Sequence, residues 1–312
     1  MKLSRQIGLL AAGLACAFAA HAQTIKETPN SQFKPTGKGW GELDNVASDA
    51  SSGKAGGASR SASTSNLTLH GGPVMTAPKN LYYIWYGSQW DAASKNVLTN
   101  IGQNLGGSPY FNINTTYYNS ANVKVQNSLT LAASITDSGS LGTQLSDANI
   151  ASIVSGAITS GKLPNDANGI YVVLTDHSTT ATSGFCTQYC GWHTHATIGG
   201  KDIKYSFVGN PETQCPAGCG VNNPTLNGTP GADAMASILA HELEEAVTDP
   251  DLNAWYALSN GMENGDKCAW NFGTVSTAAN GAKYNQTMGS MKYLIQQNWT
   301  LLPSQACAQH YP

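Results

Sequence analysis

The stretch from residue 232 to residue 247 is the most helix-like part of this 312-residue chain, and it carries His-Glu-Leu-Glu-Glu at positions 241–245. A helix brings positions i and i+4 to the same face, so His241 and Glu245 are expected to point in the same direction. The pattern differs by one residue from the His-Glu-x-x-His zinc motif. We therefore expect the fold to be built around a helix that can hold a metal ion.

Two acidic residues after this helix complete a candidate ligand set. Glu263 follows Glu245 after 17 intervening residues, and Asp266 comes shortly afterwards. A catalytic zinc site needs three protein ligands and one open position. We expect His241, Glu245 and Glu263 to bind the metal, with Asp266 as the second choice for third ligand or as a partner that orients His241. Glu242 lies where the general base of a metallohydrolase would lie.

The composition of this ligand set bears on the metal that it would hold. Two carboxylates and one imidazole form a harder and more anionic site than two imidazoles and one carboxylate. Zinc is the expected metal, but the set also suits another divalent cation such as manganese or calcium. Two alternatives stay open. The site could bind a metal without catalysis, or His241 and Glu245 could form an ordinary ion pair on a solvated helix face.

Three further residues are candidates for a catalytic role beside the metal. His193 and His195 are two positions apart, so on a strand they would face the same way and could share a metal or contact a substrate. Tyr256 follows the motif helix closely. Any one of the three could stabilise an oxyanion. The alternative for the two histidines is a polar role on a loop held by disulfides.

The cysteines predict disulfide bonds in an exported protein. Of seven cysteines, Cys16 falls in the predicted signal peptide, and the other six remain. An even number of cysteines in an exported chain indicates disulfides. We expect two local bridges and one that secures the C-terminus, although a cysteine-bound zinc is the alternative. The expected pairs are Cys186 with Cys190, Cys215 with Cys219, and Cys268 with Cys307.

The ends and the charge of the chain indicate export. Residues 1–22 have the basic start, apolar run and Ala-His-Ala cleavage site of a bacterial-type secretory signal. Residues 23–66 are a Ser-, Gly- and Ala-rich leader, linker or propeptide that is too polar to fold alone, and residues 67–312 form one domain. No later segment has the roughly 18 apolar residues that span a bilayer. The mature chain has 14 basic and 19 acidic residues, which argues against nucleic-acid binding.

Apolar patterns predict a domain of mixed secondary structure. We expect strands at 81–86, 110–118, 123–129, 169–174 and 205–208, and helices at 91–105, after Ser146, and at 232–247. Asp233 is the expected cap of the motif helix, and Pro250 its stop. Strands followed by a helix that bears a metal motif predict an α+β fold: a zincin-like mixed sheet with a metal-motif helix, stabilised by disulfides.

Several segments of residues 67–312 resemble the Exordium, or phosphate-induced protein 1, family. The matching segments are 70–74, 81–87, 171–175, 185–186, 190–193, 208–210, 214–216, 241–243, 253–256 and 292–294, together with the single residues Cys219, Glu245, Thr248, Pro250, Glu263, Asp266 and Cys268. The resemblance implies an extracellular, wall-associated protein that in plants is linked to growth control. It implies no particular reaction.

Two functions are consistent with these observations. The first is a secreted metal-dependent hydrolase, most simply a zincin-type peptidase, in which Glu242 takes the proton of the attacking water. The second is a non-catalytic protein that binds a wall polysaccharide or another extracellular partner and uses the same residues as a structural cation site. Either protein would be extracellular, wall-associated or periplasmic. The oligomeric state stays open.

Overall fold

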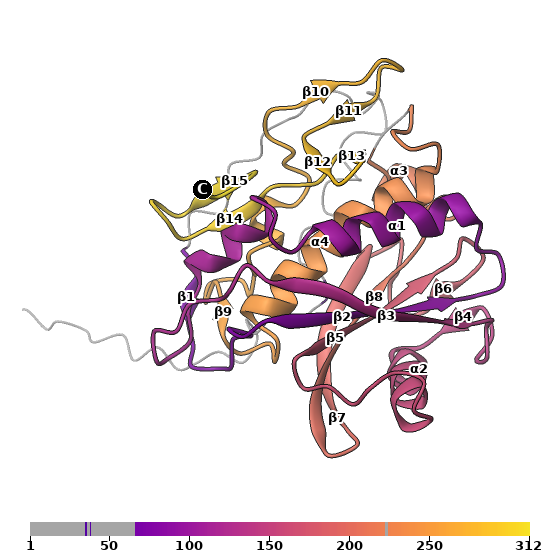
Figure 1. Cartoon of the computed structure of the whole chain (residues 1–312), viewed down its shortest axis with the longest axis horizontal. Helices are drawn as coiled ribbons and strands as arrows, with labels where there is room; N and C mark the ends of the chain where they lie inside the picture. Colours follow the sequence, from indigo (N-terminus) through magenta and orange to yellow (C-terminus); the bar gives the residue numbers. More distant parts are fainter. Residues whose placement is uncertain (1–34, 36–37, 39–65, 222–223) are drawn as a thin grey trace, which may run out of the picture. The chain divides into compact units, whose positions relative to one another are not determined.

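Five strands form the central sheet in the order β3-β2-β5-β8-β7 (Figure 1). Four of them are parallel, and β7 pairs antiparallel with β8 at one edge. In sheet order the strands are β3 (Leu129–Asp137), β2 (Lys79–Tyr86), β5 (Gly169–Thr175), β8 (Lys201–Val208) and β7 (Gly191–Ile198). The three inner strands are rich in apolar residues because helices cover both faces of the sheet. The predicted mixed sheet is confirmed.

The computed structural model describes residues 35, 38, 66–221 and 224–312. The chain divides into two units, Met1–Gln32 and Phe33–Pro312, and every described residue belongs to the second. The predicted signal peptide and nearly all of the predicted leader therefore lie outside the described residues. Within that leader, Lys38 contacts the domain, since its ammonium nitrogen lies 2.6 Å from Asp147 Oδ2.

Helices α1 (Ala92–Asn104) and α4 (Pro230–Thr248) cover one face of the sheet, and α2 (Asp147–Thr159) covers the other (Figure 1). Successive strand residues point to opposite faces. Tyr83 therefore packs in one core with α1 and α4, whereas Tyr82 packs in a second core with α2. The motif helix thus packs against the sheet and lies beside α1.

Side-chain caps begin α1 and α2, whereas α4 has none. Asp91 caps α1 by accepting a hydrogen bond from Ser94 N at 2.8 Å. Ser146 caps α2 as predicted, in a reciprocal capping box with Asn149. The expectation for Asp233 is wrong, because α4 already begins at Pro230. Asp233 instead binds the preceding loop, accepting hydrogen bonds from the side chains of Thr225 and Asn227.

Two strand predictions are wrong. The region predicted as a strand at 110–118 contains a 3-10 helix, η2 (Phe111–Thr116), and β3 starts only at Leu129, where the predicted strand 123–129 ends. Thr115 and Thr116 donate their hydroxyls to backbone carbonyls three residues earlier. Such local bonds favour a tight turn over a strand.

Three disulfides hold the fold together, and two of the expected pairings are wrong. The bridges join Cys186 to Cys215, Cys190 to Cys219, and Cys268 to Cys307. Gly191 pairs with Val208 at the base of the β7–β8 hairpin, so the segments just outside the hairpin lie side by side and bond across it. The bridge to the C-terminus is confirmed. Disulfides are typical of an oxidising compartment.

Short elements complete the domain. Two-stranded pairs are β1 (Thr68–Leu69) with β9 (Trp255–Tyr256), β4 (Gln144–Leu145) with β6 (Thr180–Ala181), β10 (Ser276–Thr277) with β11 (Lys283–Tyr284), β12 (Gln286–Met288) with β13 (Met291–Tyr293), and β14 (Asn298–Thr300) with β15 (Ala306–Ala308). A short helix α3 (Pro216–Cys219) and a 3-10 helix η3 (Asp266–Cys268) carry cysteines. Among the described residues, none of the helices has the length and apolarity that crossing a membrane requires.

Candidate metal centre

The motif helix α4 is buried on all sides. It packs against β7, β8 and α1, and η2 and β13 also contact it. His241, Glu242 and Glu245 each have an exposed fraction of 0%. The interpretation of His241 and Glu245 as a pair on a solvated helix face is therefore wrong. Charged groups are almost never fully buried unless they are paired or bind a metal.

His241, Glu245 and Asp266 converge in the protein interior. His241 Nε2 lies 2.9 Å from Glu245 Oε1 and 3.6 Å from Asp266 Oδ1. The backbone N–H of Asp266 donates a hydrogen bond to Glu245 Oε1 at 3.0 Å. The helical i, i+4 spacing thus brings the first two together, and η3 delivers the third from beyond the end of the helix.

His193 enters the same region from strand β7. Its Nδ1 lies 3.5 Å from Glu242 Oε2 and 3.4 Å from Glu245 Oε2, and its Nε2 lies 3.5 Å from Glu263 Oε1. Glu263 therefore faces His193, on the opposite side of that ring from Glu242. We call the six residues His193, His241, Glu242, Glu245, Glu263 and Asp266 the histidine–carboxylate cluster.

Two sequence candidates lie outside this cluster. The imidazole of His195 is partly exposed and lies 2.9 Å from Asp202 Oδ1 and 3.6 Å from Asp251 Oδ1. Tyr256 stacks on His70 with ring centroids 3.8 Å apart. His195 therefore faces two aspartates, and Tyr256 faces His70.

Sequence reasoning missed three polar residues that support the cluster. The Gln296 side-chain amide contacts His241 Nδ1 and so orients that ring. Asp249 Oδ1 accepts hydrogen bonds from Asn253 N and Ala254 N, while the carbonyl of Asp249 lies 3.3 Å from His193 Nε2. Glu244 is buried as well, and Asn298 donates to it at 2.5 Å. The only sequence signal for Glu244 was its place in the acidic motif.

Two glycines allow the chain to approach the cluster closely. A Cβ atom on Gly265 would lie 2.8 Å from Cγ of His241, and one on Gly191 would lie 2.8 Å from Glu242 Oε1. Both contacts are shorter than real Cβ atoms make. Any larger residue at Gly265 would push η3 away from the helix, and one at Gly191 would displace β7.

Comparison with known proteins identifies the family. Residues 67–309 match the model of the phosphate-induced protein 1 conserved region. The chain belongs to this family. Relatives include the protein EXORDIUM-like 5 of Arabidopsis thaliana, which is 32% identical over 274 residues that cover 75% of each chain. The protein PHOSPHATE-INDUCED 1 of Nicotiana tabacum is 28% identical over 61% of this chain and 67% of its own.

A shorter match concerns the protein EXORDIUM of Arabidopsis thaliana, which is 38% identical over 145 residues, or 41% of this chain and 44% of its own. No solved structure matches this phosphate-induced protein 1 family member significantly. These relatives are plant proteins. The bacterial type of the signal peptide lies outside the described residues and stays a prediction.

Burial and mutual attraction oppose each other in the cluster of this family member. Burial lowers the pKa of His193, but Glu242 and Glu245 outweigh it and raise that pKa from 6.5 to about 10. Burial raises the pKa of Glu245, but His241 and His193 outweigh it and lower the value to about 2. Burial and the charge of Glu245 raise the pKa of Asp266 to about 6. The carboxylates thus favour a charged His193, whereas burial and neighbouring negative charge disfavour ionisation of Asp266.

The donor atoms of the cluster fit a cation. Within the described part of the chain, several buried atoms have no hydrogen-bond partner, namely His193 Nδ1, Glu245 Oε2, Glu263 Oε1 and Asp266 Oδ1. A buried polar atom without a partner costs about 1–3 kcal/mol, so four such atoms in one place are unusual. Imidazole nitrogen and carboxylate oxygen are ligands that zinc and manganese accept.

Proposed function

We propose that this family member is a secreted, metal-dependent hydrolase of the zincin type, acting on peptide bonds. The observation that carries the proposal is the convergence of His241, Glu245 and Asp266 on one buried point, with Glu242 beside them. A motif helix packed against a mixed sheet is the arrangement expected of a zincin-like fold. The disulfides support export to an oxidising compartment.

The proposed ligands are His241, Glu245 and Asp266, with Asp266 in place of Glu263 as the third. Asp266 Oδ1 lies 3.6 Å from His241 Nε2, whereas Glu263 contacts His193 instead. The proposed cation is zinc, with manganese or calcium as the alternatives for so anionic a donor set. When bound, the cation supplies Lewis acidity to the substrate carbonyl.

The remaining residues of the cluster would handle protons and charge. Glu242 accepts the proton of the attacking water as general base. His193, which Glu242 and Glu245 hold in its charged form, stabilises the negative charge that develops on the carbonyl oxygen. Glu263 orients His193, and Gln296 orients His241. In this mechanism His195 and Tyr256 have no chemical role.

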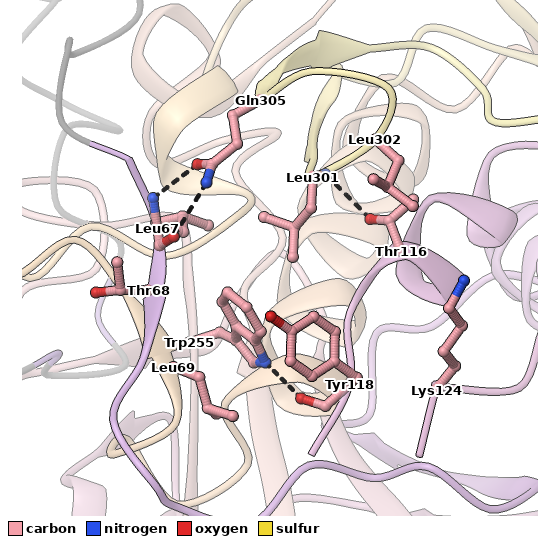
Figure 2. Close-up of a pocket in the computed structure, with 10 residues that line it drawn as sticks. All are labelled: Leu67, Thr68, Leu69, Thr116, Tyr118, Lys124, Trp255, Leu301, Leu302 and Gln305. Atoms are coloured by element: carbon pink, nitrogen blue, oxygen red, sulfur yellow. Dashed lines mark hydrogen bonds between the residues drawn. The ribbon is translucent and has the colours of Figure 1, made fainter. Parts of the chain in front are cut away.

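A second function has one observation in its favour. The side chains of His241, Glu242 and Glu245 are completely buried, and closure of this kind is typical of structural rather than catalytic metal sites. In that case the cation stabilises the fold, and a wall polysaccharide or partner binds elsewhere. One cavity of about 400 Å³ lies apart from the cluster, lined by Tyr118, Trp255, Lys124 and other residues (Figure 2).

One set of variants tests the proposal. We expect the secreted protein to contain a transition metal by elemental analysis, and His241→Ala and Asp266→Ala to lose it. Glu242→Gln should keep the metal but cleave an unstructured protein substrate such as casein at least about 100-fold more slowly. His195→Gln, on the same strand as His193 but outside the cluster, is the matched control.

The possible outcomes either distinguish the two functions or reject both. Full hydrolytic activity in Glu242→Gln would reject the mechanism. Metal in the wild type without cleavage of any protein substrate, together with a lower melting temperature after chelation, would favour the structural cation site. A wild-type protein without metal, which also takes up none on addition, would reject both.

A further inference from the structure

The carboxylate of Glu245 faces two different histidines. Its Oε1 lies 2.9 Å from His241 Nε2, and its Oε2 lies 3.4 Å from His193 Nδ1. His241 is on α4 and His193 is on β7, so the two imidazoles approach the carboxylate from separate elements. A carboxylate held in this way has one oxygen available to each of two neighbouring positions.

The second position has its own set of donors. His193 Nδ1, Glu242 Oε2 and Glu245 Oε2 lie close enough to share one ion, and all three residues are buried. His193 Nδ1 and Glu245 Oε2 have no hydrogen-bond partner among the described residues. Their separation of 3.4 Å is longer than a good hydrogen bond between charged groups. A cation between them would satisfy both atoms.

A comparable group on the surface behaves differently. His195, Asp202 and Asp251 also lie within reach of one ion. There, however, the ammonium group of Lys204 contacts both aspartates and lies 2.5 Å from Asp251 Oδ1. That lysine already supplies the positive charge, and the residues are partly exposed. In the buried group, by contrast, the described contacts of His193 join its imidazole to the carboxylates of Glu242, Glu245 and Glu263.

We propose that His193, Glu242 and Glu245 form a second divalent-cation position, with Glu245 bridging it to the position at His241 and Asp266. The second position is the weaker one, because two divalent ions on one carboxylate repel each other. Filling it engages the carboxylate of Glu242. Excess metal therefore inhibits hydrolysis. This inhibition rests on the proposed function, but binding of the second cation does not depend on it.

Metal stoichiometry tests the second position without any assay of activity. The secreted protein, stripped with a chelator, is titrated with Zn²⁺ alone and followed by calorimetry and native mass spectrometry. We expect two equivalents, the second bound at least tenfold more weakly. His193→Gln should keep the first and lose the second. His195→Gln, two residues along the same strand, should keep both. Circular dichroism of each variant establishes that it is folded.

A spectroscopic measurement on the wild type covers the case in which His193→Gln does not fold. With Mn²⁺ as the probe, the second equivalent should give an exchange-coupled electron paramagnetic resonance signal, because Glu245 bridges the two ions. A single equivalent in the wild type, two equivalents in folded His193→Gln, or two uncoupled ions would overturn the second position. One equivalent that His241→Ala abolishes would leave the proposed function standing. Two coupled ions without cleavage at any loading would leave the second position standing and reject the hydrolase.

Discussion

At the scale of single residues, Gly265 leaves no room for a side chain beside the motif helix. A Cβ atom there would lie 2.8 Å from the His241 ring, so Gly265→Ala must separate the motif helix from the segment that carries Asp266. We expect zinc affinity, measured by calorimetry, to fall at least about tenfold, which corresponds to roughly 1.4 kcal/mol. Gly156→Ala in α2 is the matched control, because nothing lies within 4 Å of its added Cβ. Equal affinities in the two variants would contradict the close packing.

Two buried aspartates make the stability of the metal-free protein depend on pH. Burial raises the pKa values of Asp249 and Asp266 from 3.8 to about 6. The folded state therefore binds more protons than the unfolded state between these values, so the free energy of unfolding falls as the pH rises through this window. By about pH 4.5, Glu245, whose pKa is lowered from 4.5 to about 2, has already contributed most of its stabilisation.

Thermal unfolding in a chelator at several pH values measures this effect. We expect the melting temperature of the metal-free protein to decrease from about pH 4.5 to about pH 6, and saturating zinc to weaken the decrease, since a bound cation favours the ionised carboxylates. A melting temperature that rises across the window without metal would show that other groups dominate.

The sequence predicted some contacts between residues of the candidate site but not others. The i, i+4 rule predicted the approach of His241 and Glu245, because a helix fixes that spacing whatever surrounds it. Nothing local could show that Asp266 lies beside His241 and Glu263 beside His193, since that depends on how the chain turns into η3 after the helix. Nor could alternation on a strand show that β7 buries His193 against the motif helix while His195 meets an exposed aspartate.

At the scale of elements, the N-terminal cap of α1 is open to a direct test. Asp91 accepts hydrogen bonds from both the backbone and the hydroxyl of Ser94. Asp91→Ala should lower the free energy of unfolding in urea by about 1 kcal/mol, and Asp91→Ser should retain most of it. An unchanged urea midpoint in Asp91→Ala would mean that tertiary packing alone holds the start of α1.

The elements that sequence predicted best are those whose signals are local. Strands β2 and β5 are short apolar runs, and α2 has both its cap and its helical period within a few residues. The strand β3 was placed too early. It lies at the sheet edge, and exposed and less exposed residues alternate along it. The C-terminal strand pairs are two or three residues long, too short to give a pattern.

At the scale of the whole molecule, the Cys268–Cys307 bridge links the C-terminus to the candidate metal centre. It closes a loop of sequence separation 39, and such a disulfide typically stabilises a fold by about 2–4 kcal/mol. We expect the double variant Cys268→Ser, Cys307→Ser to lose stability of this order in urea. It should also bind zinc more weakly, because Cys268 and Asp266 belong to the same 3-10 turn. Unchanged zinc affinity would show that η3 keeps its position without the bridge.

The two disulfides at the base of the β7–β8 hairpin impose an order on the maturation of the protein. Both bridges join the segment before β7 to the segment that follows β8, and Cys190 stands three residues before His193. A chain whose thiols are still reduced lacks the disulfide bonds next to the strand that carries His193. In the proposed function, oxidation of these cysteines therefore precedes complete cation loading, and a molecule kept among reducing thiols is expected to bind its cation incompletely.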